Sequence, residues 1–468
     1  MVFASYEFLV FFTFVLALYW IFPKRNWQNL LLLVSSAVFY GWIAPWHVLV
    51  LFGSTVMDYL LALGMARWKS RSTALLWIGV TLNLGLLAFI KYFVWLRPPL
   101  NVFFTENFGV QSGIFATHII LPLGVSFYAL KKIGYLIDIN RGSLKPERDL
   151  IAFAAYISFF PQVFSGPIDR PQKLLAQLQS ARYWSGSNFH HAWTLLVMGF
   201  FKKIVIADTV NVFVDQVFLM QEPSKVFLIV GALGFTLQIL VDFSSYTDLS
   251  RGFAFLLGLQ TAENFNKPYL ALTPGEFWNR WHMSFSFWLR DYVFFPLRRA
   301  MLKTKRIPEF VSQAIPPLVT MFISGLWHGT GFTFIVWGLY YGVLIAAYQW
   351  AGIRGEWKPE NRIGRFLAWL VMFNFIVFGW AIFRAGSLPW LWNVLIVAPF
   401  SNTPAELTAA LVILTMTAFY ALLLLAKHIV DQTSPDRVNL RAFYYAAAAA
   451  LTVIFMNSSS PDFIYFQF

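Results

Sequence analysis

The sequence has no cysteine and few charged side chains. Without cysteine the chain forms no disulfide, no thiolate metal site, no iron–sulfur cluster and no thioester of its own. Charged residues make up 12% of the 468 residues, whereas soluble domains carry about 25%. With 58% hydrophobic residues, the chain lacks the polar surface of a water-soluble particle. The composition therefore predicts a polytopic membrane protein.

The net charge of +13 has two explanations, nucleic-acid binding and basic cytoplasmic loops. Because cytoplasmic loops of membrane proteins are rich in Lys and Arg and face anionic lipid, we favour the loops and expect membrane lipid, not nucleic acid, as a partner. The basic clusters expected on the cytoplasmic side are Arg298, Arg299, Lys303, Lys305 and Arg306; Arg67, Lys69 and Arg71; and Arg354, Lys358, Arg362 and Arg365.

Apolar stretches of spanning or near-spanning length recur along the whole chain. Residues 2–22 lack a basic start and a cleavage site, which predicts a retained first span. We expect an all-α polytopic membrane protein, a single integral-membrane domain over 1–468, with about ten to twelve transmembrane helices plus re-entrant or amphipathic helices around a central tunnel. The predicted stretches are 2–22, 28–50, 51–66, 73–96, 114–137, 150–166, 190–215, 225–241, 248–260, 310–327, 331–351, 364–384, 406–427 and 441–456.

The block at 274–297 is rich in aromatic residues yet contains Glu, Arg, His and Asp. It is too polar to span in contact with lipid. A re-entrant or amphipathic helix that lines an internal cavity fits both properties. Pro274 suits the first turn of such a helix, and Glu276 suits its positive end.

Of the seven histidines, His328 has the most unusual context, a glycine-rich break at 324–331 between two apolar stretches. We expect Pro316 and Pro317 to delay the start of the preceding helix. Ten residues then remain before His328, about 15 Å of helix, which places it near the membrane midplane. Ionisable residues at that depth are commonly functional; the alternative is a histidine that only joins two helices. His282 is the second candidate. For the remaining histidines we expect positions at the membrane interface or ordinary structural contacts; these are His47, His118, His190, His191 and His428.

His282 lies in the polar aromatic block, and a re-entrant helix would bring it close to His328. Two such histidines form either a base with its partner or half a metal site. No acidic pair with ligand-like spacing lies near them and cysteine is absent, so we expect no metal. Neither GxGxxG nor GxxxxGK[ST] occurs, so the sequence does not predict ATP hydrolysis.

Several motifs together resemble the membrane-bound O-acyltransferase (MBOAT) superfamily, in its bacterial branch of alginate O-acetylases and D-alanyl transfer proteins. The resemblance covers essentially the whole chain. Its most specific parts are EFWNRWH at 276–282 and LWHG at 326–329; others are MVFAS at 1–5, LGVSFY at 123–128, SGPI at 165–168, DFSSYTD at 242–248 and FIYFQF at 463–468.

This resemblance implies that His328 is the catalytic histidine and His282 the second polar site position. It implies that the acetyl group of a CoA thioester, most simply acetyl-CoA, reaches a tunnel from the cytoplasm, with no permanently bound cofactor. His328 would act as general base on an acceptor hydroxyl, while His282 with Asn279 or Trp278 orients the groups or stabilises the oxyanion. The expected residues around the substrate or tunnel are Asn279, Trp278, Arg280, Trp327, Ser324, Gly325, Tyr246 and Asp291.

The resemblance further implies a multi-pass protein of the bacterial inner membrane that O-acetylates an alginate- or cellulose-like exopolysaccharide. The implied partners are a periplasmic SGNH-type acetyltransferase and the polysaccharide synthesis machinery. D-alanyl transfer to an envelope polymer and peptidoglycan O-acetylation remain open. Ser245 stands where the family usually has glycine, and Lys131 and Lys132 are unusually basic. The motifs NKP at 266–268, DR at 169–170 and FWLRD at 287–291 resemble in part the D-alanyl group. A proton-coupled transporter or flippase, or a purely structural subunit, would be alternatives from other classes.

Overall fold

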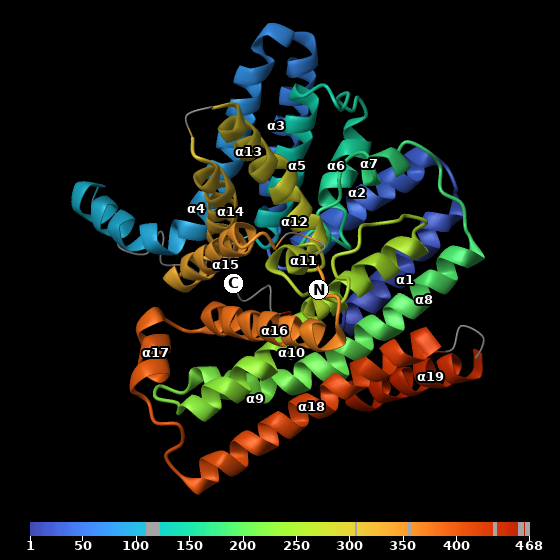
Figure 1. The fold of residues 1–468 in the computed structure, drawn as a ribbon. Helices are drawn as coiled ribbons and strands as arrows, with labels where there is room; N and C mark the ends of the chain where they lie inside the picture. Colours follow the sequence, from blue (N-terminus) through green and yellow to red (C-terminus); the bar gives the residue numbers. More distant parts are fainter. Residues whose placement is uncertain are drawn as a thin grey trace. The chain divides into compact units, whose positions relative to one another are not determined.

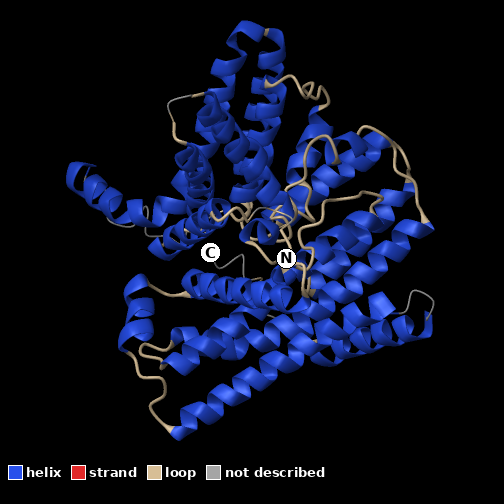
Figure 2. Cartoon of the chain, viewed as in Figure 1, coloured by secondary structure: helices blue, strands red, loops and turns tan. Residues whose placement is uncertain are grey.

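The computed structural model describes residues 1–108, 122–304, 307–353, 355, 357–433, 438–456 and 463. Within these ranges the regular structure is entirely helical (Figure 2). The predicted all-α polytopic membrane class is confirmed. Predictions for His118, Lys305, Arg306, Arg354 and residues 464–468 fall outside the described residues.

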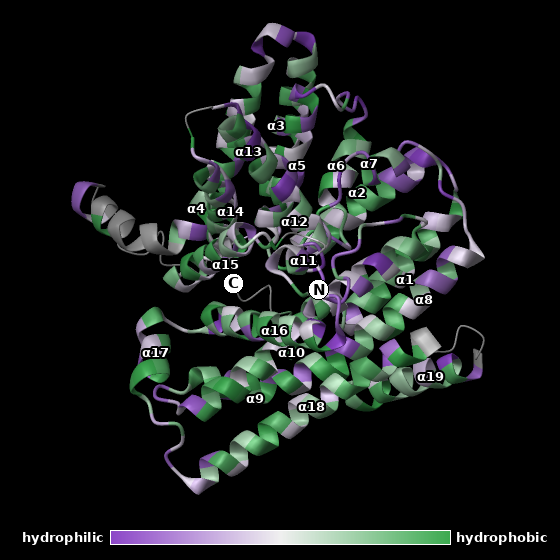
Figure 3. Cartoon of the chain, viewed as in Figure 1, coloured by the Kyte–Doolittle hydropathy of each residue, from purple (hydrophilic) through white to green (hydrophobic). Residues whose placement is uncertain are grey.

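Seven helices of the described part are long and apolar enough to cross a membrane. Hydrophobic residues dominate their length, as α16 and α18 show in Figure 3. The predicted total of ten to twelve spans stays a prediction. The seven are α3 (Trp46–Arg67), α4 (Ser72–Phe108), α10 (Lys225–Leu256), α14 (Glu309–His328), α15 (Phe332–Trp350), α16 (Arg362–Arg384) and α18 (Pro404–Thr433).

The chain divides into two compact units, Met1–Phe189 with Phe253–Ala262, and His190–Gly252 with Glu263–Phe468. The predicted single domain over 1–468 remains a prediction. Besides α3 and α4, the first unit contains α1 (Tyr6–Ile21), α2 (Arg25–Gly41), the 3-10 turn Lys69–Arg71, α5 (Val125–Asn140), α6 (Leu150–Ser158) and α7 (Leu174–Gln177).

The two unusual lysines of α5 are buried in the first unit and have polar partners there. Lys132 pairs with Asp58 at 3.2 Å, and Asn83 donates to the same carboxylate at 2.9 Å. The ammonium of Lys131 donates to Gln162 at 2.8 Å. Because an unpaired buried charge is very costly, these contacts explain how α5 carries two lysines in an apolar unit.

The predicted division between 28–50 and 51–66 was wrong, because the break falls earlier. Helix α2 ends at Gly41 and α3 begins at Trp46, directly after Pro45. Proline disfavours a helical residue before it but suits the start of a helix. The residues on both sides of this break are apolar, so hydropathy alone does not show where one helix ends and the next begins.

The second unit holds both histidine blocks. Its short segments alternate with the long helices, and Figure 1 gives their arrangement within this unit. Besides α10, α14, α15, α16 and α18, it contains α8 (Gly186–Phe200, from His190 on), the π-helical turn Phe201–Ala207, α9 (Asp208–Leu219), η3 (Pro268–Leu270), α11 (Pro274–Trp278), α12 (Met283–Leu289), the π-helical turn Arg290–Phe294, α13 (Phe295–Lys303), α17 (Leu388–Trp392), the π-helical turn Asn393–Val397 and α19 (Val438–Phe455).

The predicted separate stretches 225–241 and 248–260 are one helix, α10. The polar run between them continues the helix because its acids have lysine partners. Lys203 lies 3.0 Å from Asp242 and 2.9 Å from Asp208, and Lys202 lies 2.6 Å from Asp248. Paired in this way, carboxylates are tolerated inside an apolar helix bundle.

The predicted late start of the helix before His328 was also wrong. Helix α14 begins at Glu309 and contains Pro316 and Pro317. Because Pro316 has no N–H, the carbonyl of Ser312 lacks its helical donor; the guanidinium of Arg298 donates to it at 2.8 Å. The 20 residues of α14 span about 30 Å, so the midplane estimate for His328 loses its basis.

Helices α14 and α15 lie side by side and approach closely through glycines (Figure 1). A Cβ on Gly338 would lie 2.3 Å from the carbonyl oxygen of Met321, and one on Gly325 would lie 2.3 Å from that of Phe334. Such small-residue contacts are typical of helix pairs in membranes. They fix the position of the α14 end that carries His328.

We expect Gly338→Ala to destabilise the protein by about 1–3 kcal/mol, because the added methyl group meets backbone rather than a movable side chain. Thermal unfolding of the purified protein in detergent measures the loss. Gly85→Ala is the matched control, since its helical Cβ would enter open space. Equal stability of the two variants would contradict the close packing.

Candidate functional site

The segment before His282 is a short helix with a well-formed start. Thr273 caps α11 by accepting the N–H of Glu276 at 3.1 Å, and Pro274 occupies the first turn. The Glu276 carboxylate accepts the N–H of Leu272 at 2.7 Å and pairs with Arg280 at 2.6 Å. The predicted roles of Pro274 and Glu276 are confirmed. The guanidinium of Arg280 is therefore held by an ion pair with Glu276 of α11.

His282 precedes α12 with a left-handed backbone, φ 42°. Among the described residues only Lys267 shares this conformation without being glycine. Asn264 holds the turn: its carbonyl accepts the N–H of Met283 at 2.9 Å, and its side-chain oxygen accepts that of Ser284 at 3.1 Å. The same oxygen lies 3.4 Å from Nδ1 of His282. A left-handed non-glycine residue costs about 1–3 kcal/mol and is frequent at functional sites.

The ring of His282 is surrounded by aromatic side chains. Its centroid lies 4.7 Å from that of Phe243, 5.0 Å from Phe285 and 6.1 Å from Trp327. His282 lies outside the seven membrane-length helices, and its burial among these rings lowers its pKa to about 3. The imidazole is therefore neutral at physiological pH.

His328 ends α14 and is buried in a second ring cluster. Its centroid lies 4.9 Å from Trp327, 5.1 Å from Trp337 and 5.3 Å from Phe383. It also contacts Phe285 at 5.9 Å. Because both histidines contact Phe285 and Trp327, the fold brings the two histidine blocks together, as the sequence predicted.

A cavity of about 200 Å³ is lined by residues of α11, α12, α14 and α15, and neither His282 nor His328 is among its lining residues. Three predicted residues line it, namely Trp278, Asn279 and Ser324. On α14 its lining follows one helix face through Pro317, Thr320, Met321 and Ser324, and His328 is the next residue on that face. The cavity lining on α14 therefore ends at Ser324, one helical turn before His328.

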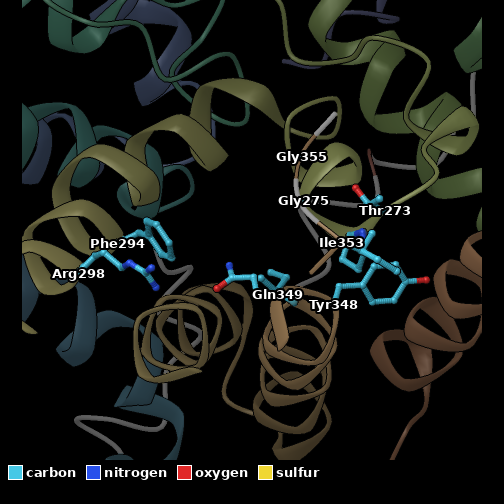
Figure 4. Close-up of a pocket in the computed structure, with 10 residues that line it drawn as sticks. Thr273, Gly275, Phe294, Arg298, Tyr348, Gln349, Ile353 and Gly355 are labelled. Carbon is cyan, nitrogen blue, oxygen red and sulfur yellow. The ribbon is translucent and has the colours of Figure 1, made fainter. Parts of the chain in front are cut away.

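A second cavity of about 260 Å³ adjoins the first. The two share the lining residues Gly275, Phe294, Ile345 and Gln349. Figure 4 shows Arg298 and Gln349 facing one another across the second cavity, with Tyr348 directed away. The combined space extends from Arg298 of the basic α13 to Ser324 of α14.

Two polar atoms of the first cavity have no hydrogen-bond partner in the described structure, Nε1 of Trp278 and Oγ of Ser324. Ser324 is 1% exposed. Buried polar groups are nearly always satisfied, so a ligand is the natural partner of such atoms. The cavity thus offers a donor and a hydroxyl to a bound molecule.

The other predicted residues lie away from the cavity lining. Tyr246 packs against Phe463 at 5.0 Å, and Asp291 pairs with Arg290 at 3.0 Å. Gly325 serves the α14–α15 contact, and Trp327 stacks on Phe285 at 4.3 Å. Within the described ranges, no group of three or more His, Asp or Glu side chains is arranged to hold a metal ion.

Sequence reasoning missed several lining residues: Thr320, Arg290, Gln349 and Arg298. Thr320 precedes Ser324 by one helical turn, and this spacing would have found it. No comparable signal marks Gln349, because it is one polar residue near the end of an apolar helix.

Comparison with known proteins agrees with this architecture. The sequence model of the membrane-bound O-acyltransferase family (MBOAT) matches residues 143–379, which include both histidines. The probable alginate O-acetylase AlgI of Pseudomonas aeruginosa is 37% identical over 402 residues, which cover 84% of this chain and 74% of the relative.

Two further relatives carry other names. The peptidoglycan O-acetyltransferase of Helicobacter pylori is 31% identical over 401 residues, covering 79% of this chain and 72% of the relative. The teichoic acid D-alanyltransferase of Bacillus subtilis is 33% identical over 275 residues, covering 56% and 68%.

The lowered pKa of His282 predicts a stability change with pH. The unfolded chain takes up a proton near pH 6.5, whereas the folded site does so only near pH 3. This group therefore leaves stability unchanged above pH 6.5 and reduces it as pH falls from 6.5 toward 3. Between pH 6.5 and 5 we expect the reduction to be about 2 kcal/mol.

His282→Gln should remove that part of the pH dependence from the thermal unfolding of the purified protein. The exposed His190 provides the control, His190→Gln, which should keep the full dependence. Identical pH profiles for both variants would refute a neutral, buried His282.

Proposed function

Because the chain belongs to the membrane-bound O-acyltransferase family, we propose that it moves an acetyl group from a cytoplasmic thioester to a hydroxyl for O-acetylation of an extracellular polysaccharide. The chain is a multi-pass membrane O-acyltransferase. The observation that carries the proposal is the cavity on the α14 face whose lining reaches Ser324, one helical turn before the buried His328. A buried base next to such a cavity is suited to acyl transfer.

In this proposal His328 is the general base. It removes the proton of the acceptor hydroxyl while that oxygen bonds to the thioester carbonyl carbon. The carbon–sulfur bond then breaks, and the thiol leaves with the proton returned by the imidazolium. Since the chain has no cysteine, direct transfer between the two substrates is simpler than a covalent enzyme intermediate.

His282 acts beside this base as a positioning group. Its neutral ring is held by Asn264 and contacts the same Phe285 and Trp327 rings as His328. Trp278 donates through Nε1 to the bound acyl donor, and Asn279 lines the same cavity. Fixed donors in a water-excluded site stabilise the developing oxyanion without reorganisation.

The donor enters through the cavity that Arg298 lines. By the positive-inside rule this basic end is cytoplasmic, where acetyl-CoA is available. A guanidinium favours phosphate groups of the kind that CoA carries. Arg290 adds a second cation at the inner cavity. The donor is a substrate, and the mechanism requires no resident cofactor.

The acceptor hydroxyl belongs to the glycan or to a serine of a periplasmic SGNH-type partner that works with the polysaccharide synthesis machinery. Under this proposal the protein works in the bacterial inner membrane. The alginate O-acetylase matches 84% of this chain, whereas the D-alanyltransferase matches 56%. This difference favours acetyl over D-alanyl transfer and an alginate-like exopolysaccharide as the polymer.

We expect His328→Ala to lower polymer O-acetylation by about 10²–10⁴-fold, because the general base is lost. Mass spectrometry of cell-surface polymers measures the acetyl content. The control is His191→Ala, at an exposed position, with expression and thermal unfolding compared for both. Wild-type acetylation by a well-expressed His328→Ala protein would refute the assignment.

Trp278→Phe tests the donor contact because it removes the indole N–H and keeps an aromatic ring at this position. Loss of one hydrogen bond to the bound donor should lower kcat/KM for acetyl-CoA about tenfold or more. Trp193, which is 54% exposed, gives the matched control Trp193→Phe. If both substitutions leave kcat/KM unchanged, Trp278 does not contact the donor.

A further inference from the structure

A third cavity, of about 340 Å³, lies in the second unit and shares no lining residue with the other two. It is formed by the loop that leads into η3 and by the last part of α18. Its lining residues are Lys267, Leu270, Leu424, Leu425, Lys427 and His428. The proposed acyl transfer makes no use of this cavity.

The lining divides into two chemical halves. Lys267, Lys427 and His428 are basic or can become so, and three leucines supply the rest. None of the six residues is acidic. A ligand that matches both halves has a negatively charged group and a hydrocarbon chain.

The cavity faces the side of the membrane that the basic clusters mark as cytoplasmic. Helix α16 begins at Arg362, in a basic cluster, and α18 runs back after α17 and its π-helical turn, which are too short to span. The end of α18 that carries Lys427 therefore lies on the side of Arg362. Trp369, near the start of α16, donates to the carbonyl of Tyr269 in η3 at 2.9 Å, which places the loop on that side too.

The backbone of Lys267 is unusual. It has φ 49° and, with His282, is one of two left-handed non-glycine residues in the described part. The loop is held by a hydrogen bond from Asn266 N–H to the Arg280 carbonyl at 2.9 Å, and Pro268 follows at the start of η3. Strain of this kind persists where surrounding structure imposes it and is concentrated at binding sites.

We propose that this cavity binds an anionic phospholipid of the cytoplasmic leaflet. The phosphate lies between Lys267 and Lys427, and an acyl chain packs on Leu270, Leu424 and Leu425. Basic pockets between helices on the cytoplasmic side are suited to anionic headgroups. The apolar half favours a lipid over a free phosphate, which would leave the leucines without a partner. This site is separate from the proposed acyl transfer and does not depend on it.

The test uses the full-length protein, delipidated in detergent, with phosphatidylglycerol or phosphatidylcholine added and bound lipid counted by native mass spectrometry. We expect one tightly held phosphatidylglycerol and no comparable phosphatidylcholine. Lys267→Gln with Lys427→Gln should weaken phosphatidylglycerol binding about 25-fold, from about fivefold per lysine. The control is Lys358→Gln with Arg365→Gln, two basic residues of the same side outside the cavity.

Lys267→Arg with Lys427→Arg should retain the lipid and so separates loss of charge from misfolding. Inorganic phosphate at millimolar concentration should not displace phosphatidylglycerol. Undiminished binding by the Gln variant, equal binding of phosphatidylcholine, or displacement by phosphate alone would each overturn the proposal.

Discussion

Lipid offers no hydrogen-bond partner, so each polar group that this chain carries into an apolar environment needs a partner from the protein. This requirement explains contacts that otherwise look unrelated. Lysines neutralise the acids within α10, and Arg298 satisfies the carbonyl that Pro316 leaves open. Asn264 holds the turn at His282. The positions of the helix ends, and with them the candidate site, depend on these pairings.

Against that background, the unsatisfied atoms are informative. Trp278 Nε1 and Ser324 Oγ lack hydrogen-bond partners in the described structure, and both residues line the cavity beside α14. Other buried polar atoms of the described residues also lack a hydrogen-bond partner, among them Nε1 of Trp337 and of Trp380, but Trp278 and Ser324 line a described cavity and those two do not. His282 and Lys267 have left-handed backbones, which are strained for residues other than glycine. Such strain is frequent at functional sites.

Much of the fold and part of the site were predictable from the sequence, for identifiable reasons. Composition determined the membrane class, and Pro274 with Glu276 marked the start of α11 because capping is a local property. The motifs located both histidines. The continuity of α10 and the early start of α14 were not predictable, since each depends on a partner distant in sequence, Lys203 in one case and Arg298 in the other. The roles predicted for the histidines stay predictions.

The glycine contacts between α14 and α15 also bear on how the protein moves. Backbone meets backbone at Gly325 and Gly338, so neither helix can slide or rotate against the other without a clash. The position of His328, at the end of α14, is therefore fixed relative to α15.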